Sequence, residues 1–138
     1  MEIVKFTLIS DRIEFGPEPS PEEEMEQRLT FNSKGQVWFT GYKYDAPNGR
    51  KMRLCISKEI AGKLFILLSN YLEQYGRMPL VTDIGIWIAA VTDPSGKKIC
   101  FRGSLCPDYR PNGSTNLSDV FRTVFSIEDL FAFDGNPG

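Results

Sequence analysis

Apolar and polar residues alternate along several segments of the chain, which is the period of a half-buried β-strand. In residues 2–10, Val4, Phe6 and Leu8 fall on one side of an extended chain and Lys5 falls on the other. The same alternation predicts further strands at residues 25–31 and 52–56, and residues 36–44, which are apolar on both faces, predict a more central strand between them.

Short turns join these strands into hairpins. Residues 32–35, Asn-Ser-Lys-Gly, suit a type I turn that ends in a glycine free to take positive φ. Residues 84–92 are apolar on both faces, which favours the central strand of a sheet. The Asp-Pro-Ser-Gly turn at residues 93–96 then returns the chain as a strand over residues 97–103. Because turns this short cannot join parallel neighbours, we expect antiparallel pairing.

Two segments carry the spacing of an amphipathic helix. The longer one spans residues 58–75 and follows Ser57, a suitable N-cap. The shorter one spans residues 117–125 and follows Asn116, a second N-cap. After it, residues 127–133 are apolar enough to predict a last short strand.

These elements predict one α+β domain over residues 1–138. Its mostly antiparallel sheet of about six or seven strands packs against the helix at 58–75, with the shorter helix at 117–125 beside it. The pattern leaves the strand order open. Each half also has a hairpin whose second arm contains Phe-x-Gly, at residues 39–41 and 101–103. Internal duplication therefore stays open as an alternative to the reuse of common turn residues.

The absence of histidine changes the functional picture most. The chain has no histidine in 138 residues, and Cys55, Cys100 and Cys106 form no ligand-spaced cluster. No phosphate-binding glycine motif is present either. We therefore expect no metal and no cofactor. An enzyme that works without histidine or metal is therefore our third hypothesis, after the two binding functions described below.

Two weaker catalytic candidates remain. Cys100 should share a strand face with Arg102, and a guanidinium beside a thiol favours the reactive thiolate. The alternative is that Cys100 fills a sheet as a small apolar residue. Asp83, Asp93 and Asp134 stand at element ends, where Asp serves turns and caps. Neither set marks an active site.

Cysteine usage and hydropathy bear on the compartment. Three cysteines, an odd number, argue against a disulfide framework and for a reducing cytosol. The longest apolar stretch, residues 84–91, is too short to span a bilayer. We expect a cytoplasmic protein with no membrane partner.

Charge is uneven along the chain although its net value is only −2. Residues 11–27 hold seven acids and one base, whereas residues 43–63 hold six bases and two acids. The acidic stretch contains three prolines in residues 17–21, which predicts an exposed acidic, proline-rich loop at residues 16–24.

These charged stretches define the candidate interaction surface. It consists of Glu18, Glu22, Glu23, Glu24, Tyr42, Lys43, Arg50, Lys51 and Arg53. Our first hypothesis is a small non-catalytic module that binds another protein. The alternative is nucleic-acid binding by the aromatic and basic face at residues 38–53. The net charge of −2 disfavours that alternative, and Trp38 and Phe39 point to opposite faces of one strand, so at least one belongs to the core. The partner's identity and the oligomeric state stay open.

Overall fold

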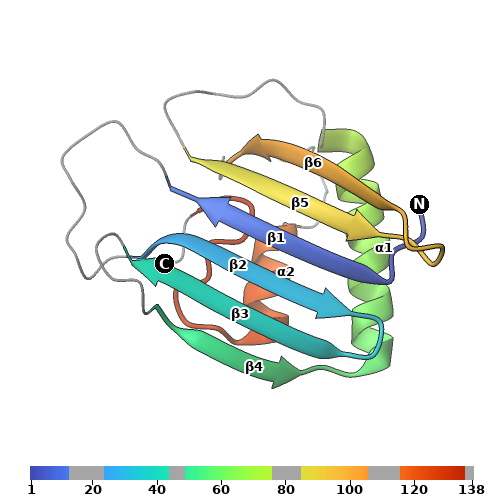
Figure 1. Ribbon diagram of the computed structural model, residues 1–138, viewed down its shortest axis with the longest axis horizontal. Coiled ribbons are helices and arrows are strands. Elements are labelled where there is room, and N and C mark those ends of the chain that lie inside the picture. The colour runs from blue at the N-terminus through green and yellow to red at the C-terminus, as the bar shows by residue number, and fades with distance from the viewer. Residues whose placement is uncertain (13–23, 44–48, 76–84, 106–115, 136–138) are drawn as a thin grey trace.

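The structure is a computed structural model of one α+β domain with a six-stranded antiparallel sheet, one long helix and one short helix (Figure 1). It describes residues 1–12, 24–43, 49–75, 85–105 and 116–135. The elements are β1 (Lys5–Asp11), β2 (Glu24–Asn32), β3 (Gln36–Lys43), β4 (Lys51–Cys55), α1 (Lys58–Tyr75), β5 (Ile86–Thr92), β6 (Lys98–Ser104) and α2 (Leu117–Phe125). The predicted fold class is confirmed.

The strand order is β4-β3-β2-β1-β5-β6, and every neighbouring pair is antiparallel. β1 and β2 occupy the centre, and β5 lies second from an edge. The prediction that residues 84–92 form the central strand was therefore wrong. Ile86 and Ile88 make this strand apolar on its second face, but neither of the two described helices covers that face. The presence of apolar side chains on both faces of β5 therefore did not indicate a position at the centre of the sheet.

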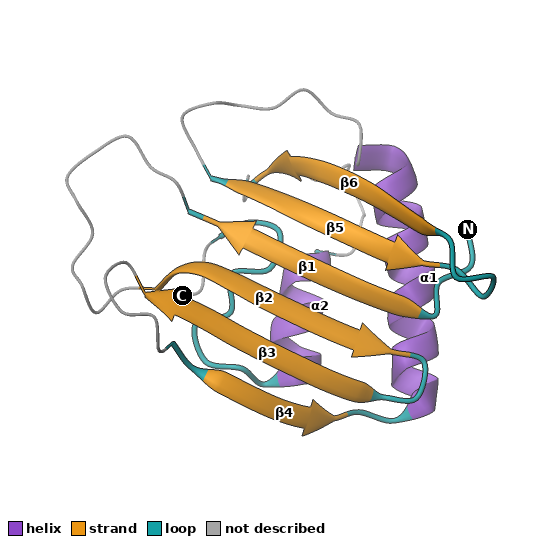
Figure 2. Ribbon diagram, viewed as in Figure 1, coloured by secondary structure: helices purple, strands orange, loops and turns teal. Residues whose placement is uncertain are grey.

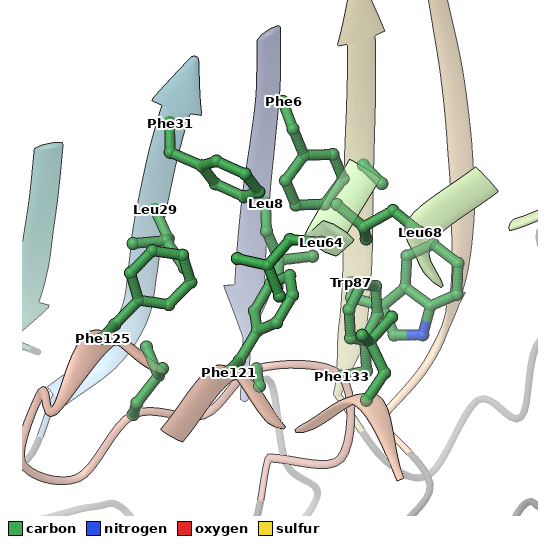
Figure 3. Packing of buried hydrophobic residues seen from close by; sticks show 14 of the residues in the cluster. Phe6, Leu8, Leu29, Phe31, Leu64, Leu68, Trp87, Phe121, Phe125 and Phe133 are labelled. Carbon is green, nitrogen blue, oxygen red and sulfur yellow. The ribbon is translucent and has the colours of Figure 1, made fainter. Parts of the chain in front are cut away.

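Both helices lie on the same face of the sheet (Figure 2). Alternate strand residues point toward them and are buried, so the core forms a layer between sheet and helices. Figure 3 shows side chains of β1, β2 and β5 meeting those of α1 and α2. The largest buried core residues include Phe6, Leu8, Leu29, Phe31, Phe39, Leu64, Leu68, Leu72, Trp87 and Phe121.

The two helices begin at the predicted N-caps. The Ser57 hydroxyl accepts a hydrogen bond from the backbone N–H of Ile60 at 3.1 Å. The Asn116 side-chain oxygen accepts from the N–H groups of Ser118 at 3.1 Å and Asp119 at 3.4 Å. Each cap satisfies donors that the first turn of a helix leaves without a partner.

Glycine has a clear steric role where β5 and β6 pair. Gly103 stands directly opposite Trp87. A Cβ atom on Gly103 would lie 2.4 Å from the Cζ2 atom of Trp87, so only glycine leaves room for the indole. The pairing continues without interruption on both sides of Gly103. In this second arm the Phe-x-Gly glycine therefore serves packing and marks no bulge.

The predicted last strand at residues 127–133 is wrong. The chain there forms turns, and Ser126, Asp129 and Ala132 have positive φ values of 51°, 58° and 50°. Positive φ interrupts an extended strand. The apolar residues of this stretch are nevertheless buried. We refer to residues 126–135 as the C-terminal segment.

Buried polar side chains satisfy the backbone of the C-terminal segment. Gln27 donates to the carbonyl of Asp129 at 2.7 Å and accepts from the N–H of Phe131 at 2.8 Å. The Ser10 hydroxyl donates to the carbonyl of Ala132 at 2.6 Å. These hydrogen bonds replace the ladder that a strand would have supplied, so an irregular segment can be buried.

Arg122 of α2 fastens the same segment from the helix side. Its guanidinium donates to the carbonyls of Leu130 at 3.0 Å and Phe131 at 3.1 Å. It also forms an ion pair with Asp134. The segment is therefore held between α2 and the ends of β1 and β2.

Candidate functional site

The sheet face opposite the helices is the first functional candidate among the described residues. We call it the open face, because no helix or strand within the described residues covers it (Figure 2). Its side chains are half-buried or exposed and alternate with the buried residues of the core. The open face comprises Lys5, Thr7, Ile9, Asp11, Glu26, Arg28, Thr30, Asn32, Gln36, Trp38, Thr40, Tyr42, Lys51, Arg53, Cys55, Ile86, Ile88, Ala90, Thr92, Lys98, Cys100, Arg102 and Ser104.

An apolar strip runs through the open face along β1 and β5. Ile9 and Ile88 are directly opposite each other in the ladder between these strands. Ile86 and Ala90 continue the strip on β5 in both directions. The strip consists of Ile9, Ile86, Ile88 and Ala90, all half-buried.

Basic residues lie on both sides of the apolar strip. Arg28 of β2 pairs with Ile9 in the ladder. Arg102 of β6 pairs with Ile88. Across four strands, one row therefore reads Arg-Ile-Ile-Arg. The open face as a whole carries six bases, namely Lys5, Arg28, Lys51, Arg53, Lys98 and Arg102, and two acids, Asp11 and Glu26. This face is basic although the chain has a net charge of −2.

An arginine side chain lies against each of the two aromatic rings of the open face. The guanidinium of Arg53 lies 5.7 Å from the ring centroid of Trp38. That of Arg28 lies 5.5 Å from the ring centroid of Tyr42 and also pairs with Glu26 at 3.3 Å. These are cation–π distances. One face of each ring is thus engaged within the molecule.

The two open-face acids stand side by side at one end of the face. Asp11 pairs with Glu26 across β1 and β2. Burial raises the pKa of Asp11, and the negative charge of Glu26 raises it further. This end of the face therefore differs from the opposite end, where Lys5 and Lys98 both pair with Thr92 on β5.

The structure separates the residues of the predicted interaction surface. Tyr42, Lys51 and Arg53 lie together on the open face. Lys43 has the opposite parity on β3 and is half-buried opposite Glu24. Glu18, Glu22 and Glu23, with the rest of the predicted acidic loop before Glu24, lie outside the described residues.

Glu24 and Arg50 pair with each other. Glu24 is the first residue of β2, and its side chain is only 11% exposed. The Arg50 guanidinium donates to its carboxylate at 3.0 and 2.6 Å and lies 5.1 Å from the ring centroid of Phe39. The hydrogen bond to Glu24 raises the pKa of Arg50. This pair joins β2 to the start of β4, so its charges already satisfy each other.

Several open-face residues were not part of the interaction surface predicted from the sequence. Ile9 and Arg28 belong to β1 and β2, whereas Lys98 and Arg102 belong to β6, which is far away in the sequence and joins the sheet through β5. Their outward parity was the available signal, but the β1–β5 pairing that joins them was not predicted. Trp38 and Phe39 do point to opposite faces, as expected, and Phe39 is 1% exposed in the core.

Cys100 lies on the open face of β6 and is exposed. Arg102 is two residues further along the same face, which confirms the expected placement of this pair. Cys55 is also exposed, on β4 at the other edge of the sheet. Cys106 lies outside the described residues.

A second candidate is a groove between the N-terminal residues and α1. Its volume is about 540 Å³, and Glu2 is its one charged side chain. The exposed side chains of Ile66 and Met1 form part of its lining, together with Ile3, Val4, Ser33, Gly62 and Phe65. It is a largely apolar hollow, and the charged α-ammonium of Met1, which also lines it, is paired with the Glu73 carboxylate at 3.3 Å.

In the described ranges, no three Cys, Asp or Glu side chains come together as a metal site. Neither helix there is long and apolar enough to cross a membrane. The chain matches no known protein-family model and no curated protein sequence.

Proposed function

We propose that this protein is a non-catalytic interaction module that binds another protein through its open face. The observation that carries the proposal is the apolar strip around Ile9 and Ile88, flanked by Arg28 and Arg102. An apolar centre with a polar rim is the usual anatomy of a protein–protein interface, and arginine is enriched there.

The dimensions of the open face suit this function. Six strands about 4.8 Å apart and seven residues rising about 3.3 Å each give a face of roughly 24 by 23 Å. Its projected area of roughly 550 Å² approaches the approximately 800 Å² of accessible surface that each partner buries in a standard interface. Side chains roughen the face and add to the area that a partner can bury.

The same residues favour a protein over a nucleic acid. Base stacking uses exposed aromatic faces, and one face of each of Trp38 and Tyr42 is already engaged by a guanidinium group, which reduces the ring surface left for bases. Asp11 and Glu26 lie on the same face and would repel phosphate. The apolar strip has no counterpart in a phosphate backbone.

We place this function in the cytosol. Cys55 and Cys100 are exposed thiols on β4 and β6, the two edge strands of the described sheet. Opposite edges are too far apart for a disulfide between these two residues. A reducing compartment keeps such thiols free.

The test is site-specific photo-crosslinking in cells that express the protein at its native level. A crosslinker at Ile88 should trap one defined protein, and the substitution Ile9→Lys should abolish the adduct because it places a charge in the apolar strip. A crosslinker at Lys63 on α1 is the matched control and should not trap that protein. Equal trapping from both positions would refute the proposal.

Nucleic acid is examined in the same series. Fluorescent single- and double-stranded oligonucleotides are titrated at about 50 mM salt, where phosphate contacts are strongest. We expect no measurable binding. If an oligonucleotide binds with micromolar affinity and the variant Arg53→Glu abolishes this binding, the partner is a nucleic acid and the proposed protein partner is refuted.

A further inference from the structure

We infer that the open face receives an acidic amphipathic helix of the partner, lying along β1 and β5. This inference rests on the binding function proposed above and adds the shape, charge and direction of the bound element. It depends on the Arg-Ile-Ile-Arg row and on the contrast between the two ends of the face.

The width of the strip fits one helix. Arg28 and Arg102 are on β2 and β6, with β1 and β5 between them. Three spacings of about 4.8 Å separate their backbones by roughly 14 Å. A helix with its side chains is about 10–12 Å across. It can therefore rest on the two isoleucines and reach an arginine on each side.

The length also fits. β1 and β5 have seven residues each, which corresponds to roughly 23 Å. A helix of about 15 residues spans a similar distance. Alternate strand residues such as Ile86 and Ile88 are about 6.6 Å apart along the strand, compared with about 5.4 Å for the rise of one helical turn.

The flanking charges select an acidic helix. Lys98 and Arg102 on one side of the strip, like Lys5, form no ion pair with any residue in the described part of the chain. Carboxylates on both flanks of an apolar helical stripe would meet Lys98 and Arg102 on one side and, on the other side, Arg28, which also pairs with Glu26 at 3.3 Å. Charge complementarity of this kind fixes register and suppresses wrong partners.

The two ends of the strip set the direction of the helix. Asp11 and Glu26 mark one end, and Lys5 and Lys98 mark the other. A helix carries partial positive charge at its N-terminus and partial negative charge at its C-terminus. Its N-terminus therefore lies at Asp11, its C-terminus lies at Lys5, and the helix runs parallel to β5.

The probe is a synthetic peptide of about 18 residues with a leucine stripe flanked by glutamates. One control peptide has the same composition in scrambled order, and the other has lysine in place of glutamate. Binding to the full chain is measured by fluorescence anisotropy at about 100 mM salt, where surface charges are already partly screened. We expect the acidic helix to bind about tenfold tighter than either control, since both charge and stripe contribute. Equal affinities for the three peptides would overturn the inference.

Charge reversal on the protein supplies the second readout. The double variant K98E/R102E should lose binding of the acidic peptide, while K63E, a lysine reversal on α1, should retain it. All three substitutions are at exposed positions, and circular dichroism is used to check that each variant is folded. A loss of the same size in K63E would show a diffuse charge effect and would refute the site.

Direction is tested with a spin label at either end of the bound peptide. A label at the N-terminus should broaden the amide resonances of Asp11 and Ile86, and one at the C-terminus those of Lys5 and Thr92. The reverse pattern would refute the proposed direction.

The outcomes separate the two proposals. If Ile88 traps a protein in cells but the acidic peptide binds no better than its controls, the helix inference fails and the binding function stands. If neither result appears, both fail. A peptide-free dimer in light scattering that K98E/R102E disrupts would identify a second copy of this chain as the occupant and would overturn the helical partner.

Discussion

The two faces of this sheet are made by alternate residues of the same strands, yet they differ in almost every physical respect. On β1, Phe6 and Leu8 are at most 1% exposed, while Thr7 and Ile9 between them are half-buried. The covered face is closed by two helices. The open face keeps a narrow apolar strip and surrounds it with charge. A strand thus encodes a core and a recognition surface at the same time, because its side-chain period is two.

The two tryptophans show the contrast within one residue type. Trp87 is 2% exposed and packs edge to face against Phe133, with the two ring centroids 5.1 Å apart. Trp38 is half-buried on the open face, where its contact partner is the Arg53 guanidinium. The first indole serves the core. The second remains partly accessible to a partner.

The largest expected effect comes from truncating these two indoles. Trp87→Ala should lower the free energy of unfolding by about 3–5 kcal/mol, because it leaves a cavity between β5, β6 and the C-terminal segment. Trp38→Ala should cost less than about 1.5 kcal/mol, since solvent fills the vacated space. Urea denaturation monitored by circular dichroism measures both. Losses of equal size would mean that the open face is as much a part of the core as the covered one.

A smaller effect is expected from the polar side of the core. Gln27→Leu should lower the free energy of unfolding by about 1–3 kcal/mol, because the buried N–H of Phe131 loses its acceptor and the partly buried carbonyl of Asp129 loses its donor. Hydrogen exchange should accelerate at residues 129–133.

The control for Gln27 is Thr30→Val on the open face of the same strand. The Thr30 hydroxyl is within 3.0 Å of the Thr7 hydroxyl, and both residues are half-buried. Water can replace that hydrogen bond, so this variant should change the free energy of unfolding by less than about 1 kcal/mol. A Thr30→Val loss as large as that of Gln27→Leu would contradict the distinction between the faces.

Local chemistry made much of the fold predictable. The turns end in Gly35 and Gly96, whose φ values are 84° and 90° as their positions require. The N-caps Ser57 and Asn116 begin the two helices, and residue alternation assigned the strand faces. Each of these features depends on residues a few positions apart, which is the range over which sequence patterns carry physical meaning.

Long-range pairing set the limit of that prediction. Residues 127–133 read as a strand because they are apolar, but Gln27 and Ser10 bind their backbone from more than 100 residues away. The candidate site has the same limit. Lys51 and Arg53 were predicted from local charge, whereas the Arg-Ile-Ile-Arg row exists only because β5 pairs with β1. Strand order, which alternation does not encode, decides which charges share a row.

The smallest effect concerns two carboxylates whose surroundings shift their pKa values in opposite directions. Asp11 on the open face has a raised pKa, first because of burial and then because of Glu26. Asp93, in the turn between β5 and β6, has a lowered pKa because the Ser95 hydroxyl donates to its carboxylate at 2.6 Å. Burial on the sheet and hydrogen bonding in a turn thus act on the same chemical group with opposite sign.

The variants Asp11→Asn and Asp93→Asn should therefore give opposite pH profiles of stability. The raised pKa of Asp11 means that the folded chain binds this proton more tightly than the unfolded chain. The stabilisation that protonated Asp11 gives to the fold is fully present below the pKa of Asp11 in the unfolded chain. It is lost as the pH rises through the pKa of Asp11 in the folded chain. Asp11→Asn should gain stability relative to the native chain across that rise. Asp93 has a lowered pKa, so its ionised form stabilises the fold at any pH above the pKa of Asp93 in the unfolded chain. This stabilisation is lost as the pH falls through the pKa of Asp93 in the folded chain. Asp93→Asn should therefore be less stable than the native chain near neutral pH. Urea titrations from about pH 3 to pH 7 compare the two, and profiles of the same sign would show that the open-face carboxylate is as well solvated as the one in the turn.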